Sequence, residues 1–391
     1  MSFCLQQNAV LILETGDYFP AYTRTSHVYA SGTLCFNTAM TGYQEAISDP
    51  SYYGQILVFS FPHVGNVGTN PIDMEASFPF LQGIVVSDFI TDASNYRNTL
   101  NFLSWLKNNN IPCIEGVDTR TLIQVIRDYK KSLNALICSY EGILTPEKIL
   151  NIINEKGFSN LIAGKSLLSK VSTPKAFSWV EEDSEFHKNF YPIEKDSSSL
   201  IKIVVLDFGV KHSILRYLRS LGAEVIVVPA SSTYEDILSY HPSGIVFSNG
   251  PGDPRFAQSS VFKMMEKTLH NNIPILGICL GHQLLSMVYG AEIVKLPCGH
   301  HGINHPVQDL KSGVILITSQ NHEYTTKESS LPKTLKPIYR SLFDGSLEGY
   351  EVRGKSILSV QFHPEAGPGP QDAAFILSNF LKTVQNYAQK N

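Results

Sequence analysis

Short apolar runs alternate with amphipathic stretches in the second half of the chain. The runs IKIVVLDF (201–208), AEVIVVPA (223–230), SGIVFS (243–248) and IPILGI (273–278) are almost continuously apolar, and helical patterns such as KHSILRYLRSLG (211–222) lie between them. Strands of this kind are buried on both faces, which is typical of a parallel sheet with crossover helices. The pattern predicts an α/β domain over 201–391, with a mainly parallel sheet flanked by helices and ligands at the carboxyl ends of its strands. The spacing of Ser232 and Glu235 predicts a capping box at the start of one helix.

The first half of the chain has a different pattern. Strand-like runs at 9–14, 32–40 and 54–61 are separated by Gly, Pro and Asn turns, and helical patterns follow at 98–109 and 119–129. This order predicts a strand-rich α+β or barrel-like N-terminal domain. The segment SWVEEDSEFHKNFYPIEKDSSSL (178–200) is charged and only weakly periodic. We therefore expect domains at 1–177 and 201–391, joined by a linker at 178–200.

The composition argues against some classes of partner and favours one cellular location. The formal net charge is −4 and no dense Lys/Arg cluster is present, so nucleic acid is not an expected partner. No stretch approaches the roughly 20 apolar residues of a membrane helix, and the first residues lack the basic start of a signal peptide. The six cysteines are scattered without CxxC pairs. These features favour reduced thiols in a cytoplasmic protein.

Cys279 stands where a predicted strand, 273–278, meets a predicted helix, 280–290. Gly277-Ile-Cys279-Leu-Gly281 has the form of the elbow in which small residues let a nucleophile occupy a sharp strand-to-helix turn. The start of the helix would also supply N–H groups for an oxyanion. The alternative is a buried, unreactive thiol, and the five-residue pattern leaves both interpretations open.

A nucleophilic thiol needs a base, and His363 is the best-placed of the twelve histidines. It follows the apolar strand SILSVQF (356–362), which puts it at the same edge of the sheet as Cys279. Glu365, two residues later, can hold the imidazole in one tautomer. The loop SNGPGDP (248–254) also follows a strand, and its glycines permit close approach to an anion. Taken singly, each of these motifs also fits an ordinary surface turn.

Together and in this order, SNGPGDP, GICLGHQLL and QFHPEAGPGP resemble the class I glutamine amidotransferases. The N-terminal segments FNTAMTGYQEAISDPSYYGQI (36–56) and FPHVGNVGTN (61–70), with CGHHGINHPV (298–307), are similar to the small subunit of carbamoyl-phosphate synthase. The resemblance runs over nearly the whole chain.

The resemblance implies roles for particular residues. Cys279 would attack the side-chain amide of glutamine, His363 would transfer the proton to the leaving ammonia, and Glu365 would orient His363. The glutamine would be surrounded by residues from both domains: Ser51, Gly250, Gly252, Leu280, Gln283, Asn321, Glu323 and Tyr324. Because Ser51 comes from the first domain, the resemblance implies a site at the domain interface.

One position departs from the family pattern. Glu323 stands where the family usually has glycine, in the sequence QNHEY (320–324). If that position requires a positive φ, the side chain would cost about 1 kcal/mol or more in backbone strain.

The resemblance also implies a partner. Ammonia would pass through a tunnel to a separate large subunit, which uses bicarbonate and ATP with Mg to make carbamoyl phosphate for pyrimidine and arginine biosynthesis. No cofactor is expected in this chain, which contains no G-x-x-x-x-G-K-[ST] motif. His300, His301 and His305 have no accompanying ligand set at zinc spacing, so we expect a structural or partner-facing segment and no metal. His282, next to the nucleophile, is expected to be structural.

Three other functions are alternatives to this one. An amidotransferase that serves another synthetase would not carry the N-terminal segment at 36–56. A catalytically weak scaffold that regulates the large subunit would be expected to lose Cys279, His363 or Glu365, and all three are present. A free-standing hydrolase would not need the N-terminal domain.

Overall fold

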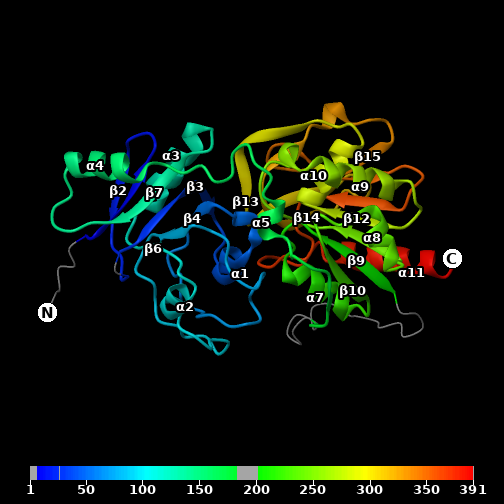
Figure 1. Ribbon diagram of the computed structural model, residues 1–391, viewed down its shortest axis with the longest axis horizontal. Helices are drawn as coiled ribbons and strands as arrows, with labels where there is room; N and C mark the ends of the chain where they lie inside the picture. Colours follow the sequence, from blue (N-terminus) through cyan, green and yellow to red (C-terminus); the bar gives the residue numbers. More distant parts are fainter. Residues whose placement is uncertain (1–6, 26, 183–200, 391) are drawn as a thin grey trace. The chain divides into compact units, whose positions relative to one another are not determined.

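The computed structural model describes residues 7–25, 27–182 and 201–390. The chain forms two compact units, one made of Met1–Ser48 with Tyr52–Ala163 and the other of Asp49–Ser51 with Gly164–Asn391. The short segment that holds Ser51 therefore groups with the second unit, although its neighbours on both sides belong to the first. Figure 1 shows each unit as a sheet with surrounding helices.

The first unit is built on a seven-stranded sheet in the order β2-β1-β7-β3-β4-β5-β6. Its strands are β1 (Ala9–Leu13), β2 (Tyr18–Ala21), β3 (Tyr29–Asn37), β4 (Gln55–Phe59), β5 (Gly83–Val86), β6 (Cys113–Ile114) and β7 (Asn134–Ser139). Its helices are α1 (Tyr43–Ser48), η1 (Pro50–Tyr52), α2 (Phe102–Asn108), α3 (Thr119–Tyr129) and α4 (Pro146–Lys156), of which η1 spans the segment that groups with the second unit.

An isolated bridge closes this sheet at one end. Tyr22, just after β2, and Glu115, just after β6, exchange two backbone hydrogen bonds of 2.9 and 2.8 Å, although β2 and β6 are the two edges of the strand order. The predicted barrel-like character of the first half is thus present as a partial closure.

Both faces of the first sheet are covered by apolar side chains. One cluster joins strand residues such as Ile56 and Val58 to Leu122 of α3, and the other joins Leu57 and Phe59 to Phe102 of α2. Alternate residues of β4 thus enter opposite clusters because successive strand side chains point to opposite faces.

The second unit is built on a ten-stranded sheet in the order β14-β13-β15-β16-β17-β12-β11-β9-β10-β8. Its strands are β8 (Phe177–Trp179), β9 (Lys202–Asp207), β10 (Glu224–Pro229), β11 (Gly244–Phe247), β12 (Ile275–Ile278), β13 (Ile293–Asp309), β14 (Ile315–Thr326), β15 (Leu335–Ser341), β16 (Leu347–Val352) and β17 (Ile357–Val360). Its helices are α5 (Leu168–Val171), α7 (His212–Ser220), α8 (Tyr234–Ser239), η2 (Pro254–Phe256), α9 (Ser259–Leu269), α10 (Leu280–Val288), η3 (Glu328–Ser330) and α11 (Phe375–Ala388).

The predicted α/β architecture is confirmed in the centre of this sheet. The neighbours β10, β9, β11, β12 and β17 run parallel, and their two faces bury separate clusters, one with α7 and α11 and the other with α8, α9 and α10. The pattern did not predict the antiparallel extension of β13 to β16. These strands carry many polar and glycine positions, so their run of apolar residues is interrupted.

One local expectation needs correction. The capping box at the start of α8 is formed by Thr233 and Asp236 rather than by Ser232 and Glu235, because the helix begins one residue later than expected. The compact units divide after Ala163, and β8 pairs with β10 of the second sheet. As domain limits, 1–177 and 201–391 stay predictions, and residues 183–200 of the predicted linker lie outside the described residues.

Within the part of the chain that the structure describes, no helix has the length and apolar character needed to cross a membrane. The five cysteines in that part are free thiols.

Candidate active site

Cys279 lies on the sharp turn between β12 and α10. It is the N-cap of α10, with φ 51° and ψ −102°, a backbone conformation that non-glycine residues rarely adopt. Two flanking glycines make the turn possible, because a Cβ on Gly277 would come within 2.5 Å of Leu285 and one on Gly281 within 2.1 Å of the Phe247 carbonyl oxygen. The turn has the geometry of a nucleophile elbow.

The thiol of Cys279 is buried and is surrounded by polar groups. Its Sγ lies 3.7 Å from the carbonyl oxygen of Asn321, to which it can donate, and 3.7 Å from Nε2 of Gln361, which donates to it. The backbone N–H of Cys279 donates to the carbonyl of Val360 over 2.9 Å. A residue that follows β17 and a residue of β14 thus both contact the sulfur. A thiol that only packs in an apolar core would not need these polar contacts.

His363 and Glu365 follow β17 and form a buried pair. Nδ1 of His363 lies 2.6 Å from Oε1 of Glu365, and the backbone N–H of His363 donates to the carbonyl of Ser319 over 2.9 Å. On the other side of the ring, Nε2 is buried and has no hydrogen-bond partner among the described residues. The structure therefore brings His363 and Glu365 together as the sequence predicted, and it leaves one ring nitrogen available for proton transfer.

The electrostatics of this pair favour a strong base. Burial disfavours the charged imidazole, but the carboxylate of Glu365 outweighs it and raises the pKa of His363 to about 10. Burial also opposes ionisation of Glu365, yet the charges of Lys211 and His363 lower its pKa to about 2. The static geometry contains no formed hydrogen bond between Nε2 of His363 and the thiol of Cys279. In structures without substrate such catalytic contacts are often long.

Lys211 is a member of this site that the sequence patterns did not reveal. Its Nζ donates to Oε1 of Glu365 over 3.0 Å and also to the carbonyl oxygen of Ala366, and the side chain is buried. Lys211 is the N-cap residue of α7, just after β9. Its place at the carboxyl end of a parallel strand was the one available signal, because all such ends meet at the same edge of the sheet.

Replacing Lys211 with methionine should destabilise the protein by about 3 kcal/mol, because removing one partner of a buried ion pair leaves the other charge uncompensated. Glu365 has a lowered pKa, so its contribution to stability is present above the usual carboxyl pKa and is lost as the pH falls toward about 2. Without Lys211 the pKa of Glu365 rises, and acid unfolding should begin at a higher pH. Urea unfolding at pH 7.5 and an acid titration followed by circular dichroism measure both effects.

Lys267→Met provides a matched control for this variant. Lys267 pairs with Glu235 over 2.7 Å, but both side chains are exposed. A solvent-exposed pair contributes little, so neither transition should move in this variant. Equal behaviour of the Lys211 and Lys267 variants would contradict the role assigned to the buried pair.

The loop 248–254 follows β11 and lies beside the nucleophile turn. Gly250 is tightly enclosed, since a Cβ there would come within 2.0 Å of the Phe208 carbonyl oxygen, and Gly252 has φ 93°. Asn249 donates from Nδ2 to Oγ of Ser51 over 3.1 Å. The backbone N–H of Gly281 donates to the carbonyl of Ser248 over 3.0 Å, which ties the loop to the start of α10.

Several of the residues expected around glutamine lie in β14 or contact it. Asn321 donates from Nδ2 to Oδ2 of Asp49 over 3.1 Å, and its Oδ1 lies 3.0 Å from Nδ1 of His301. Gln283 donates from Nε2 to the carbonyl of Tyr324 over 2.8 Å. Asp49 and His301 were not predicted as part of the site. Asp49 lies two residues before Ser51, and no pattern marked it.

Glu323 does not have the backbone strain that would follow from a positive φ at the usual glycine position. It lies within the extended strand β14 and is absent from the residues with positive φ in the described chain. Its side chain pairs with Nζ of Lys295 over 2.8 Å and is 17% exposed. The strain expected for a positive φ is therefore not present, and the residue is accommodated by an ion pair.

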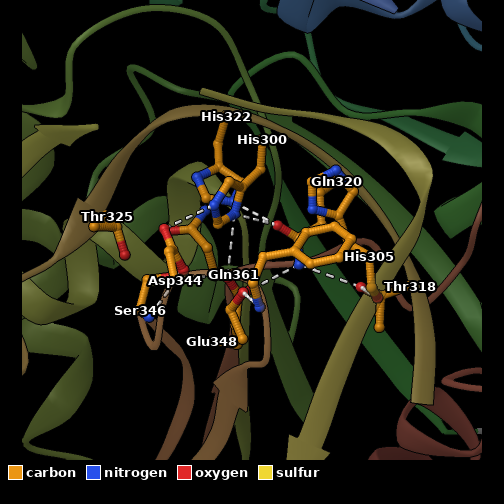
Figure 2. A network of polar contacts seen from close by, with 12 residues as sticks. His300, His305, Thr318, Gln320, His322, Thr325, Asp344, Ser346, Glu348 and Gln361 are labelled. Atoms are coloured by element: carbon orange, nitrogen blue, oxygen red, sulfur yellow. Dashed lines mark hydrogen bonds and ion pairs between the residues drawn. The ribbon is translucent and has the colours of Figure 1, made fainter. Parts of the chain in front are cut away.

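Histidines of β13 and β14 take part in a network of polar contacts (Figure 2). His300, His322 and Glu348 are all buried, and each could offer a metal a ligand atom within 4.8 Å of the others. His300 contacts Gln320 and Asp344 at 2.7 and 3.0 Å, and His322 contacts Gln320 and the Tyr324 carbonyl at 3.0 and 2.8 Å. All four ring nitrogens therefore have polar partners inside the protein, and the absence of a metal stays a prediction.

His282 occupies a structural position. It is buried, and its two ring nitrogens lie 2.8 and 3.2 Å from the hydroxyls of Ser359 and Thr326. Burial lowers the pKa of His282 to about 3, so the ring is neutral at ordinary pH. A neutral ring with both nitrogens engaged is not placed to serve Cys279.

Comparison with known proteins agrees with this geometry. The family described as glutamine amidotransferase class-I matches residues 204–383, which contain the elbow, the His-Glu pair and the loop 248–254. The second half of the chain is thus a class I glutamine amidotransferase domain. The family described as carbamoyl-phosphate synthase small chain, CPSase domain, matches residues 11–137.

Whole-chain relatives make the assignment more specific. The carbamoyl phosphate synthase small chain of Buchnera aphidicola subsp. Acyrthosiphon pisum is 43% identical, with 98% of each chain covered. Those of Escherichia coli K12 and Pseudomonas syringae pv. tomato are 40% and 41% identical, covering 97% and 96% of this chain and 98% of each relative. The chain belongs to the carbamoyl-phosphate synthase small chain family.

Proposed function

We propose that this chain hydrolyses glutamine with Cys279, His363 and Glu365 and delivers the ammonia to a large chain that makes carbamoyl phosphate. The observation that carries the proposal is the turn at Cys279, where a buried thiol follows β12, and an imidazole held by a carboxylate at 2.6 Å follows the neighbouring parallel strand β17. A nucleophile, a base and an orienting group in this order constitute the catalytic arrangement of triad enzymes.

The reaction begins with attack of the Cys279 sulfur on the side-chain amide carbon of glutamine. The thiol proton passes to Nε2 of His363, and the raised pKa of His363 stabilises the protonated imidazole that results. Collapse of the tetrahedral intermediate breaks the C–N bond, and His363 returns the proton to the leaving ammonia. Water then adds to the glutamyl thioester with His363 as the base, which releases glutamate and restores the thiol.

Backbone N–H groups stabilise the oxyanion that forms in both steps. The N–H of Leu280 belongs to the first residue of α10 and has no partner within the helix, and the loop at Gly250 to Gly252 lies next to the turn. Preorganised donors of this kind act where charge develops in the transition state. Ser51, Gln283, Asn321, Glu323 and Tyr324 complete the glutamine site in this proposal.

The partner follows from the family. The relatives are small chains of carbamoyl phosphate synthase, and a small chain implies a large one. In the proposal, bicarbonate and ATP react on that large chain, ammonia reaches it through an internal tunnel, and the product serves pyrimidine and arginine biosynthesis. This chain itself would need no cofactor for the glutaminase step, because the triad supplies the nucleophile and the proton transfers.

The test is glutamate release from glutamine by the purified chain, alone and with its cognate large chain, bicarbonate and ATP. Strong stimulation by the large chain supports a coupled amidotransferase subunit. Turnover that is not stimulated would instead indicate an independent hydrolase. No turnover in either condition would favour a scaffold that regulates the large chain.

A further inference from the structure

Gln361 contacts the Cys279 sulfur from the segment that follows β17. Its side chain is fully buried, and its Nε2 lies 3.7 Å from Sγ of Cys279. The backbone N–H of Gln361 donates to the carbonyl of Glu348 in β16 over 2.9 Å, and the carbonyl of the preceding Val360 accepts from the N–H of Cys279 over 2.9 Å. Backbone hydrogen bonds toward β16 and toward the nucleophile turn therefore hold the Gln361 side chain beside the sulfur.

The orientation of the Gln361 amide follows from a second glutamine. Gln283 donates from Nε2 to the carbonyl of Tyr324 over 2.8 Å and to Oε1 of Gln361 over 3.1 Å. A side-chain amide nitrogen has two N–H groups, and these two contacts use both. If the Gln361 amide were turned over, two NH₂ groups would face each other and a hydrogen bond would be lost. The oxygen of Gln361 therefore points to Gln283, and its NH₂ group points to the sulfur.

The two polar contacts of the sulfur favour different ionisation states. The carbonyl oxygen of Asn321, also 3.7 Å from Sγ, can only accept a hydrogen bond, so it pairs with the neutral thiol. The N–H groups of Gln361 can only donate, and a donor pairs most strongly with a charged acceptor such as a thiolate. Once the thiol proton has moved to His363, the hydrogen bond to Asn321 is lost and the hydrogen bond from Gln361 becomes stronger.

We infer that Gln361 stabilises the Cys279 thiolate for nucleophilic attack, and that Gln283 keeps the Gln361 amide in the orientation this requires. This inference rests on the proposed glutaminase function. The thiolate is the attacking form of a cysteine, so a donor that faces the sulfur raises the fraction of the protein that is ready to react. Gln283 thereby acts on the nucleophile through Gln361, apart from any contact with the substrate.

Gln361→Glu tests the inference with little change of shape. One carboxylate oxygen can still accept from Gln283, while the other replaces the donor that faces the sulfur. Each variant, in complex with the large chain, is treated with iodoacetamide over a range of pH, and mass spectrometry of the peptide that contains Cys279 gives the alkylation rate. Because the thiolate is the reacting form, the rate profile should move to higher pH by about one unit or more, which is about a tenfold fall in rate at a given pH below the midpoint.

Glutamine hydrolysis by the same complexes gives a second measurement. Gln361→Glu should lower kcat about tenfold, because less thiolate is present, and should leave KM within about twofold, because Gln283 keeps its acceptor. Gln361→Met removes the donor without adding a charge, so it tests the inference even if the buried carboxylate prevents folding. It should move the alkylation profile in the same direction, and it should also raise KM because Gln283 loses its acceptor.

Gln124→Glu is the matched control, because Gln124 is an exposed residue of α3 in the first unit, and it should change neither the profile nor the kinetics. The titratable groups His363, Glu365 and Lys211 are the same in every variant, so a shift of the profile belongs to the substituted glutamine. A folded Gln361 variant that lowers kcat without moving the alkylation profile, or that changes neither, would overturn the inference and indicate a packing role. Absence of glutamine hydrolysis by the unmodified complex, together with the expected shift in the variants, would instead count against the proposed function.

Discussion

Replacing Cys279 with serine should abolish glutamine-dependent synthesis of carbamoyl phosphate in the complex with the large chain. The loss should reach at least about 10⁴-fold, since removal of a triad nucleophile leaves only the contribution of substrate binding and the oxyanion donors. The hydroxyl of serine is smaller than the thiol and is not activated in the same geometry. Synthesis from added ammonia should stay within about twofold, because the change does not touch the chemistry of the large chain.

The two activities must be measured on the same preparation, with carbamoyl phosphate as the product assayed in both. Cys35→Ser is a suitable control, because Cys35 is also a buried free thiol but lies in β3 of the first unit. It should leave both activities near normal. If Cys279→Ser lost the ammonia-dependent activity as well, the proposal that the two reactions occur at separate sites would be contradicted. If it kept the glutamine-dependent activity, Cys279 would not be the nucleophile.

Replacing His363 with asparagine should lower glutamine hydrolysis about 10³-fold, in the middle of the range for removal of a general acid–base group. Asparagine retains a polar side chain beside Glu365, but it cannot take the thiol proton or return it to ammonia. Glutamate release under saturating glutamine measures the effect on kcat. The value of KM should change little, because His363 touches the reacting atoms rather than the rest of the substrate.

A histidine outside the site separates this effect from general disturbance. His270 is the exposed C-cap of α9, and His270→Asn should retain near-normal activity. Urea unfolding of the His363 variant gives its stability, so that a fall in activity can be corrected for unfolded protein. Near-normal glutaminase activity in a folded His363→Asn variant would assign the base to another of the histidines.

Much of this site could be predicted because its elements are local. Cys279 is placed by a strand, a turn with two glycines and a helix, all within about fifteen residues of sequence. His363 and Glu365 are two residues apart and follow directly on β17. A rule about the carboxyl ends of parallel strands was then enough to predict that the two motifs meet at one edge of the sheet.

The antiparallel extension was harder to predict for a physical reason. β13 is 17 residues long, from Ile293 to Asp309, and its pairing with β14 is interrupted by register shifts. Its polar and histidine side chains are buried against one another rather than against an apolar core, as the contacts of His300 and Gln320 show. An apolar pattern cannot reveal a strand whose buried face is polar.

The alternation of strands and helices in the parallel part of the second sheet, the elbow at Cys279 and the neighbouring His363 and Glu365 follow from patterns of a few residues, because local backbone geometry and side-chain alternation depend on adjacent positions. The contacts that those residues make with distant parts of the chain do not follow from such patterns. Lys211 and Glu365 are 154 positions apart, and Asn321 and Asp49 are 272 apart. Whether such residues touch depends on which strands become neighbours in the folded sheet, and their charge, burial and pKa values exist only once those contacts have formed.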